Sequence, residues 1–246
     1  MHQKGKSGLA RALSKMGYCS RSQAAELVRA GRVTLNGCSV RDPETPVRLG
    51  LDRVKVDGSD VEDRPKIYLM MNKPRGVVTT ASDEKGRATV YDLLDPGNQW
   101  ISPVGRLDKA SEGLLLLTND SKWAARIMDP ASHLAKRYHV HVDRVAGDDL
   151  LARIRQGARV GSDLLRVKEA QVLRVGSRNS WLEITLDEGK NRQIRRLLET
   201  LGVKVLRLMR VSIGRLELGD LKKCAVRPLT KREKRLVEQA LDGERG

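Results

Sequence analysis

The sequence predicts an α+β protein of two domains: a small αα-β domain, then a larger domain around a mixed, mostly antiparallel β-sheet with flanking helices. Three observations support this fold class. Two short helical segments near the N-terminus lead into an Asn-Gly hairpin, a series of strand-like segments follows, and few helical segments lie among them. Acidic and turn-forming residues gather at 57–65, so we place the domains at residues 1–62 and 63–246.

The first domain begins with two predicted helices. Apolar residues recur at i, i+4 and i+7 over residues 9–16, which predicts one amphipathic helix. The second helix starts with a capping box formed by Ser20 and Gln23, and Gly31 is suited to its C-terminal end. Residues 33–40 then predict two short strands around an Asn-Gly dipeptide, which favours a type I′ turn.

Basic side chains in this region are available for contacts with phosphates: Arg11, Lys15, Arg21, Arg29 and Arg32. Taken singly, each is equally consistent with solvated surface. The order of two helices and a hairpin over roughly residues 9–56 resembles the small RNA-binding domain named after ribosomal small-subunit protein four. A helix-turn-helix DNA-binding domain is the competing interpretation, but a hairpin directly after the second helix fits it less well.

The charge of the whole chain indicates a polyanionic partner. The 246 residues include 47 Lys and Arg against 31 Asp and Glu, a net charge of +16. Nucleic acid is the leading candidate, because cationic side chains displace its counterions. An anionic membrane would also attract this charge, but no long apolar run, signal peptide or lipidation motif is present, so we expect a cytoplasmic protein. The three cysteines are widely spaced and indicate neither a disulfide framework nor a zinc site.

In the second domain, alternating or continuous apolar runs predict strands at 67–71, 77–80, 114–117, 136–142, 164–175, 180–189 and 204–218. Residues 191–202 have helical period instead, with arginines on the polar side. The charged segment 230–246 predicts a solvated helix and tail. The leucine run 114–117 is too short to span a membrane, so it predicts a buried strand with Asp108 near its entrance.

Several segments of this domain carry a specific resemblance. "GRLDKASEGLLLLTND" resembles the active-site motif of the RsuA/RluB/RluE/RluF family of ribosomal RNA pseudouridine synthases. "NKPRGVVTT", "KRYHVHV" and "EGKNRQIRRLLETLG" match the other family segments in order, and the last is slightly closer to relatives that act on the large subunit. Ser111 replaces the usual threonine of the motif and retains its hydroxyl.

The resemblance implies a reaction without cofactor, in which a uridine is detached at its glycosidic bond, rotated and rejoined through carbon. It assigns the reacting carboxylate to Asp108, as nucleophile or as base in a glycal-type route. Arg195 matches the residue that pairs with this aspartate and keeps it ionised, with Arg196 as the alternative. These arginines lie about 100° apart around a helix, so only one should face Asp108.

Two further residues match family positions that contact the target nucleotide. Tyr138 matches the tyrosine that stacks on the base, and its hydroxyl is available for proton transfer; a half-buried strand tyrosine is the structural alternative. Arg106 matches the arginine that enters the RNA helix when the base is extruded; a phosphate contact or a salt bridge is the alternative. Three more basic residues are assigned to RNA contacts: Lys73, Arg192 and Arg196.

The sequence therefore predicts an enzyme that forms pseudouridine in ribosomal RNA, free or in an assembly particle. Large-subunit RNA is slightly favoured, and the chain is expected to act as a monomer without an obligate protein partner. The alternative is a non-catalytic RNA-binding or ribosome-assembly protein, which would have no need of Asp108.

Other motifs are weaker. His139 and His141 lie on one face of a strand, but no third ligand stands at metal-binding spacing, so no metal is expected. Ser111 and His133 lack the G-x-S-x-G elbow of a serine hydrolase. The glycines around Asp108 do not match a phosphate-binding loop.

Overall fold

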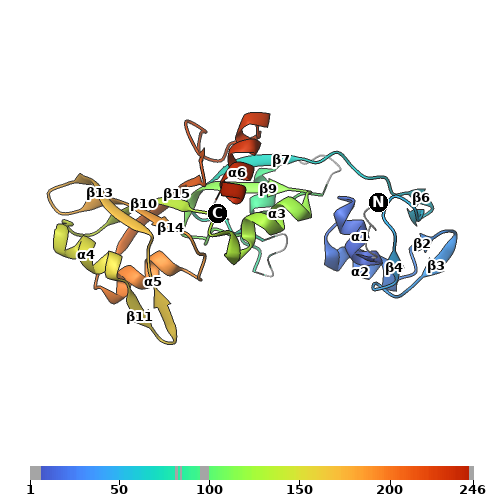
Figure 1. Cartoon of the computed structure of the whole chain (residues 1–246), viewed down its shortest axis with the longest axis horizontal. Coiled ribbons are helices and arrows are strands. Elements are labelled where there is room, and N and C mark those ends of the chain that lie inside the picture. The colour runs from blue at the N-terminus through green and yellow to red at the C-terminus, as the bar shows by residue number, and fades with distance from the viewer. Residues whose placement is uncertain (1–6, 81–82, 84, 95–99, 244–246) are drawn as a thin grey trace. The chain divides into compact units, whose positions relative to one another are not determined.

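The computed structural model of the chain describes residues 7–80, 83, 85–94 and 100–243 (Figure 1). The chain separates into two compact units. The first comprises the described residues of Met1–Tyr68, Asp95–Ser102 and Leu117–Ala124, and the second those of Leu69–Leu94, Pro103–Leu116 and Ala125–Gly246. Within the described ranges, no helix is both long enough and apolar enough to cross a membrane. The domain boundary after residue 62 stays a prediction.

The two N-terminal helices form as their sequences predict. Helix α1 covers Leu9–Lys15 and helix α2 covers Arg21–Arg29. The capping box is confirmed, because the Ser20 hydroxyl accepts a hydrogen bond from the Gln23 amide at 3.2 Å and the Gln23 side chain accepts one from the Ser20 amide at 3.1 Å. Both helices bury their apolar faces in one core, which includes Leu9, Leu13, Ala24 and Val28.

A small antiparallel sheet completes this region. Its order is β3-β2-β5-β6, with bounds Cys38–Val40, Val33–Leu35, Val54–Val56 and Ser59–Asp60. A separate pair joins β1 (Ser7–Gly8) and β4 (Pro46–Val47). Asn36 and Gly37 have φ angles of 51° and 89°, so both central residues of the hairpin adopt the positive φ that a type I′ turn requires.

The second unit is built around a larger sheet. Its order is β13-β14-β10-β15-β9-β7-β17, with β16 paired to β15 and β8 to β9. The pairing of β15 with β9 is parallel, whereas β13–β14, β10–β14, β10–β15 and β7–β17 are antiparallel. The strands are β7 (Tyr68–Lys73), β8 (Ser102–Pro103), β9 (Glu112–Thr118), β10 (Lys136–Val142), β13 (Glu169–Val175), β14 (Ser180–Leu186), β15 (Val205–Ile213), β16 (Leu216–Glu217) and β17 (Val226–Pro228). The predicted α+β class is confirmed.

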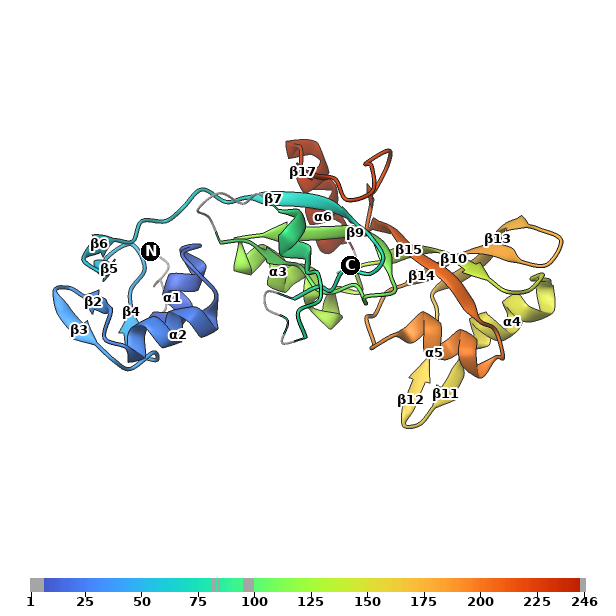
Figure 2. The ribbon, with the colours of Figure 1, turned by 180° about the vertical axis from the view of Figure 1, so that it is seen from behind.

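Helices flank this sheet. They are α3 (Ser121–Met128), α4 (Asp148–Gln156), α5 (Gln193–Thr200) and α6 (Lys231–Gly243), with 3-10 turns at Val90–Leu93 and Pro130–Ser132. Figures 1 and 2 both show α4 and α5 on the same side of β10, β13 and β14. The core between them includes Val140, Leu182, Ile154 and Leu197, each with no exposed surface. A short hairpin of β11 (Ala158–Val160) and β12 (Asp163–Leu165) precedes β13.

The sequence misassigned three segments. The single strand predicted at 204–218 is two strands, β15 and β16, which pair antiparallel with each other. Residues 77–80 form no strand: Val78 makes one isolated bridge, and the Thr79 hydroxyl donates to the Leu107 carbonyl at 2.8 Å, so this segment bonds to the loop that carries Asp108. The single strand predicted at 164–175 is two strands, β12 and β13, because the first half turns back to pair with β11. Helices α3 and α4 were not predicted, although α4 has apolar spacing and acidic residues in its first turn.

The leucine run is confirmed as a buried strand. Leu114 to Leu117 all lie in β9 and have no exposed surface. The residues that follow it end the strand and begin the next helix. Asn119 is fully buried; its side chain accepts a hydrogen bond from the Ile67 amide at 2.8 Å and donates one to the Pro65 carbonyl at 2.9 Å. Asp120 accepts bonds from the first amides of α3, as an N-cap residue does.

Candidate active site

Asp108 lies in the loop between β8 and β9, four residues before the strand begins. Its backbone carbonyl accepts hydrogen bonds from the Ser111 amide at 2.9 Å and from the Lys73 ammonium at 3.2 Å. The side chain is partly buried, and its carboxylate forms no hydrogen bond or ion pair with the residues that the structure describes. The loop is therefore fixed through its backbone, while the carboxylate stays available to a substrate.

Lys73 lies beneath this loop and is fully buried. Its ammonium donates to the carbonyls of Pro74, Asp108 and Ser111 at 3.1, 3.2 and 2.9 Å. Burial lowers the pKa of Lys73 from 10.5 to about 8, against the attraction of Asp108 and Glu112. Lys73 was assigned to RNA contact from the sequence, but its ammonium is buried and held by three backbone carbonyls, so the surface does not present it to a phosphate.

Arg195 approaches the same loop from α5. Its guanidinium donates to the Ala110 carbonyl at 2.9 Å and to the Val205 carbonyl at 3.4 Å. Burial lowers the pKa of Arg195, as does Arg192, whereas Asp108 raises it, which indicates that Arg195 and Asp108 attract each other. The structure gives the two side chains no direct ion pair; the guanidinium donates instead to the backbone carbonyls of Ala110, in the Asp108 loop, and of Val205, in β15.

Arg196 lies on another side of α5, as expected for adjacent helix positions. Its guanidinium donates to the Asp163 carboxylate at 2.9 Å and to the Val160 carbonyl at 3.2 Å. Both acceptors belong to the β11–β12 hairpin. Arg196 therefore joins this hairpin to α5 and does not pair with Asp108.

Tyr138 and Asp108 line a common cavity of about 570 Å³. Tyr138 is in β10, where it lies opposite Ile184 of β14 and Arg210 of β15. Its ring is partly buried against the core, and its hydroxyl makes no hydrogen bond to the described part of the chain. A cavity of this size is in the usual range for small-molecule and cofactor sites.

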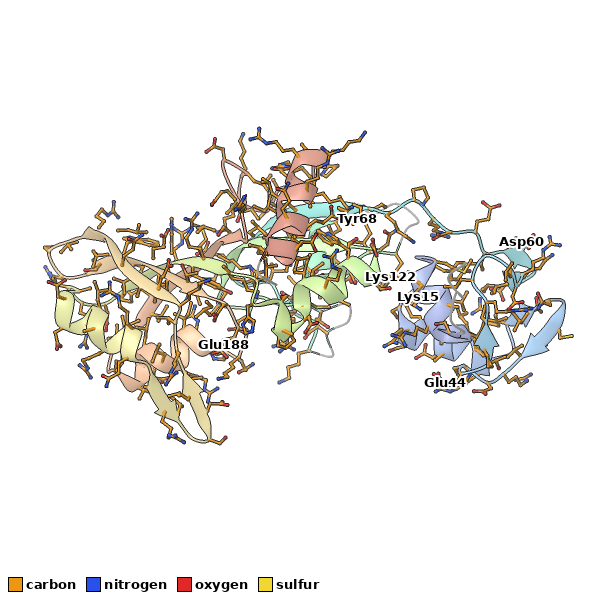
Figure 3. The ribbon with its side chains drawn as sticks, viewed as in Figure 1. Lys15, Glu44, Asp60, Tyr68, Lys122 and Glu188 are labelled. Carbon is orange, nitrogen blue, oxygen red and sulfur yellow. The ribbon has the colours of Figure 1, made fainter. Side chains whose placement is uncertain are left out.

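The exposed residues that line the cavity include three cations and the carboxylate of Asp129. Arg106 and Arg192 are exposed and line it, together with Lys190. Arg192 adopts a φ of 48° immediately before α5, and the loop ahead of it is held by Gln193, whose side chain donates to the Glu188 carboxylate at 2.5 Å and to the Arg166 carbonyl at 2.7 Å. Figure 3 labels Glu188 on this loop.

The sequence did not predict the residues where β9 pairs with β15. Gly113 has a φ of 101°, and a Cβ atom there would lie 2.2 Å from the carbonyl oxygen of Arg210. Only glycine allows this approach, and a glycine inside a strand run is a signal of such close backbone contact. Next to it, Glu112 is buried and pairs with Arg207 at 3.1 Å. Arg210 is also buried and lines the cavity; an arginine within an apolar strand was the signal for it.

The basic residues predicted in the first unit lie in three different environments. Arg11, Arg21 and Arg29 are exposed, whereas Arg32 forms an ion pair with Asp57 at 2.5 Å. Lys15 is partly buried, and its pKa is lowered by burial and by the charges of Arg11, Lys122 and Arg21. Figure 3 labels Lys15 and Lys122, which belong to the same unit. The structure thus gathers cations in this unit, as an anion-binding surface requires.

The two histidines of β10 have other contacts. His139 lies 3.3 Å from the Glu183 carboxylate, and the His141 ring stacks on Trp181 with 4.8 Å between centroids. Among the described residues, no three His, Cys, Asp or Glu side chains gather as a metal site would need.

Comparison with known proteins gives two family matches. Residues 67–200 match the RNA pseudouridylate synthase family, and residues 8–54 match the S4 domain. The chain is 36% identical over 236 residues to the ribosomal large subunit pseudouridine synthase B of Bacillus subtilis (strain 168), covering 95% of this chain and 96% of that protein. It is also 36% identical over 217 residues to the protein of the same name from Haemophilus influenzae (strain ATCC 51907 / DSM 11121 / KW20 / Rd), covering 85% of this chain and 60% of that protein.

A solved structure is similar as well. A crystal structure of a pseudouridylate synthase superposes with a TM-score of 0.66 at 28% identity, covering 94% of this chain and 99% of that one. These matches confirm both resemblances that the sequence motifs indicated. The chain belongs to the RNA pseudouridylate synthase family and is an enzyme of that class, with an S4 RNA-binding domain at its N-terminal end.

Proposed function

We propose that this enzyme converts uridine to pseudouridine in ribosomal RNA, with the Asp108 carboxylate as the reacting group. The reaction breaks the bond from N1 to C1′, rotates the base and rejoins it through C5, so it needs no oxidant, reductant or group donor. One observation carries the assignment: Asp108, whose carboxylate has no partner among the described residues, lines the same cavity as Tyr138.

Two cations act on the Asp108 carboxylate. The charges of Arg195 and Lys73 both interact with it, and neither forms a direct ion pair with it. An ionised carboxylate serves either as a nucleophile at the sugar or as a base in a glycal-type route. Arg195 and Lys73 have the further role of holding the carbonyls of the Asp108 loop, which keeps the reacting group in one position.

Tyr138 is assigned to the target base. Its ring lines the cavity and its hydroxyl has no partner among the described residues, so the ring is available for stacking and the hydroxyl for proton transfer. Arg106 is exposed and lines the cavity, where it is suited to fill the gap that an extruded nucleotide leaves in an RNA helix. Extrusion costs a few kcal/mol of lost stacking, and a planar guanidinium in the gap recovers part of it.

Ribosomal RNA is the proposed substrate, with large-subunit RNA favoured. The S4 match, the net charge of +16 and two relatives named for the large ribosomal subunit support this choice. Exposed arginines of α1 and α2 are assigned to RNA phosphates, as are Arg106 and Arg192 at the cavity. We propose that the chain acts as a monomer in the cytoplasm, on free RNA or on an assembling particle.

The test is nucleotide-by-nucleotide pseudouridine mapping of unmodified small- and large-subunit RNA and of partly assembled particles. Wild-type protein is compared with Asp108→Asn and with the control Asp149→Asn, an exposed carboxylate on α4. We expect one new pseudouridine from the wild type and the control, and none from Asp108→Asn, which keeps its RNA affinity. Full conversion by Asp108→Asn would refute the assignment of Asp108. RNA binding without conversion of any substrate would favour a non-catalytic assembly role.

A further inference from the structure

Arg210 has hydrogen-bonding capacity that the fold leaves unused. It lies in β15 with 5% of its surface exposed, and its Nε donates to the Leu114 carbonyl at 2.8 Å. Its Nη2 nitrogen is buried and has no hydrogen-bond partner, and Arg210 forms no ion pair with the described residues. The guanidinium of Arg210 is therefore buried in the protein without a carboxylate to balance its charge.

Such an arrangement costs stability. A buried donor without an acceptor costs about 1–3 kcal/mol, and an uncompensated buried charge costs more. The neighbouring charge makes the position less favourable, because Arg210 and Lys73 are both cationic and Arg210 lowers the pKa of Lys73. Contacts within the protein do not offset the cost of burying Arg210. We therefore look for a hydrogen-bond acceptor on a bound substrate.

The position of Arg210 points to the reaction site. It lines the same cavity as Asp108 and Tyr138, and it lies directly opposite Tyr138 in the pairing of β10 with β15. On its other side, the parallel pairing of β15 with β9 places it opposite Gly113, whose missing Cβ lets the two backbones meet closely. Strand pairing on both sides therefore fixes Arg210 in register with the residue assigned to the base.

The burial of Arg210 favours the target base over a phosphate as its hydrogen-bond partner. Arg106 and Arg192 are exposed and are available to phosphates outside the cavity, whereas Arg210 lines the cavity and is buried. A phosphate inside would also face the like charge of Asp108. Uracil carries two carbonyl oxygens, and a guanidinium offers donors and no acceptor, so the two match.

We infer that Arg210 is a further catalytic residue, which donates a hydrogen bond to a carbonyl oxygen of the extruded uracil. The inference rests on the proposed function. When the bond from N1 to C1′ breaks, its electron pair remains with the uracil, and the negative charge spreads to both carbonyl oxygens. The sugar is meanwhile held as an ester of Asp108, or as a glycal that has given its C2′ proton to Asp108. The rotated base forms the bond from C5 to C1′ as the Asp108 carboxylate leaves C1′ or returns the proton to C2′. The proton on C5 then moves to N1, so the product is an isomer of the substrate. Arg210 stabilises the uracil anion, whether Asp108 acts as nucleophile or as base.

The first experiment separates catalysis from stability. Arg210→Met and Arg210→Lys are compared with Arg155→Met, an arginine that also donates to a backbone carbonyl, that of Ala170, but does not line the cavity. We expect Arg210→Met to lower kcat about 100-fold with little change in KM, because the loss of one donor to developing charge typically has this size. Its unfolding stability stays equal or rises, since an unpaired buried charge is removed.

Arg210→Lys should recover part of the rate, because it keeps the charge without the planar fork. Arg155→Met should keep the wild-type rate. The catalytic role would be overturned if Arg210→Met kept a rate within about threefold of the wild type. It would also be overturned if both Arg210 variants lost activity only in proportion to a loss of folding stability.

The second experiment tests the contact itself. In the Asp108→Asn background, RNA affinity is measured with uridine, 2-thiouridine or 4-thiouridine at the target position, since sulfur is the weaker acceptor. We expect one of the thio substitutions to weaken binding about tenfold, and to lose this effect once Arg210→Met is added. Equal effects with and without Arg210 would overturn the contact. If the proposed function itself were wrong, the wild type would form no pseudouridine, which is a separate result.

Discussion

The buried ammonium of Lys73 predicts how stability depends on pH. Its pKa is lowered from 10.5 to about 8 by burial. Between these values the unfolded chain holds more protons than the folded protein, so folding stability rises with pH in this window. One pKa unit corresponds to about 1.4 kcal/mol, so the full gain is about 3 kcal/mol. It is absent below pH about 8 and complete above about 10.5.

Lys73→Met removes this titration. The difference in unfolding free energy, wild type minus variant, should therefore rise by about 3 kcal/mol from pH 7 to pH 10.5, while ionisations common to both proteins cancel. Urea unfolding at four or five pH values, followed on the second unit, measures this difference. The control is Lys168→Met, an exposed lysine in that unit, whose difference should stay flat. A flat difference for Lys73→Met would refute the desolvation of its ammonium.

Three more variants test single features. Gly113→Ala should destabilise the second unit by more than about 3 kcal/mol in denaturant unfolding, because its Cβ would lie 2.2 Å from the Arg210 carbonyl oxygen at a φ of 101°; wild-type stability would contradict the close approach. Asn119→Ala loses two buried hydrogen bonds and should cost about 2–3 kcal/mol by thermal unfolding, with no loss if these bonds are absent in solution. Arg21→Ala should weaken RNA binding and reduce the salt slope by about 0.7–0.9, and an unchanged slope would exclude a phosphate contact.

Local patterns were sufficient for several elements. The capping box at Ser20 and Gln23 and the hairpin turn at residues 36–37 need only neighbouring residues, so their sequences specified their conformations. The same holds for the leucine run, which has no low-energy place outside the core. Tyr138 and Asp108 were selected by motif, and the structure brings both to one cavity.

Other predictions were wrong or missing because they depend on contacts between segments far apart in the sequence. The segment 77–80 has strand composition, yet its polar groups bond to the loop of Asp108, a partner that local sequence does not specify. Lys73 follows the predicted strand 67–71 and precedes a turn, where lysines are usually exposed. In the structure it is the last residue of β7, and the carbonyls of Pro74, Asp108 and Ser111 hold its buried ammonium. Arg210 looked like one basic residue in an apolar strand, and only its pairing with β9 and β10 places it at the cavity.

The sequence by itself determined the α+β class and the family, and it supplied the carboxylate that we propose as the reacting group, because amphipathic period, capping and ordered motifs are properties of short segments. The tertiary structure alone decided which cations act on that carboxylate. Arg195 and Lys73 reach it through the carbonyls of its loop, while Arg196 turns to the β11–β12 hairpin. Burial and electrostatic interaction depend on distances between segments far apart in the chain, and those distances exist only once the sheet has formed.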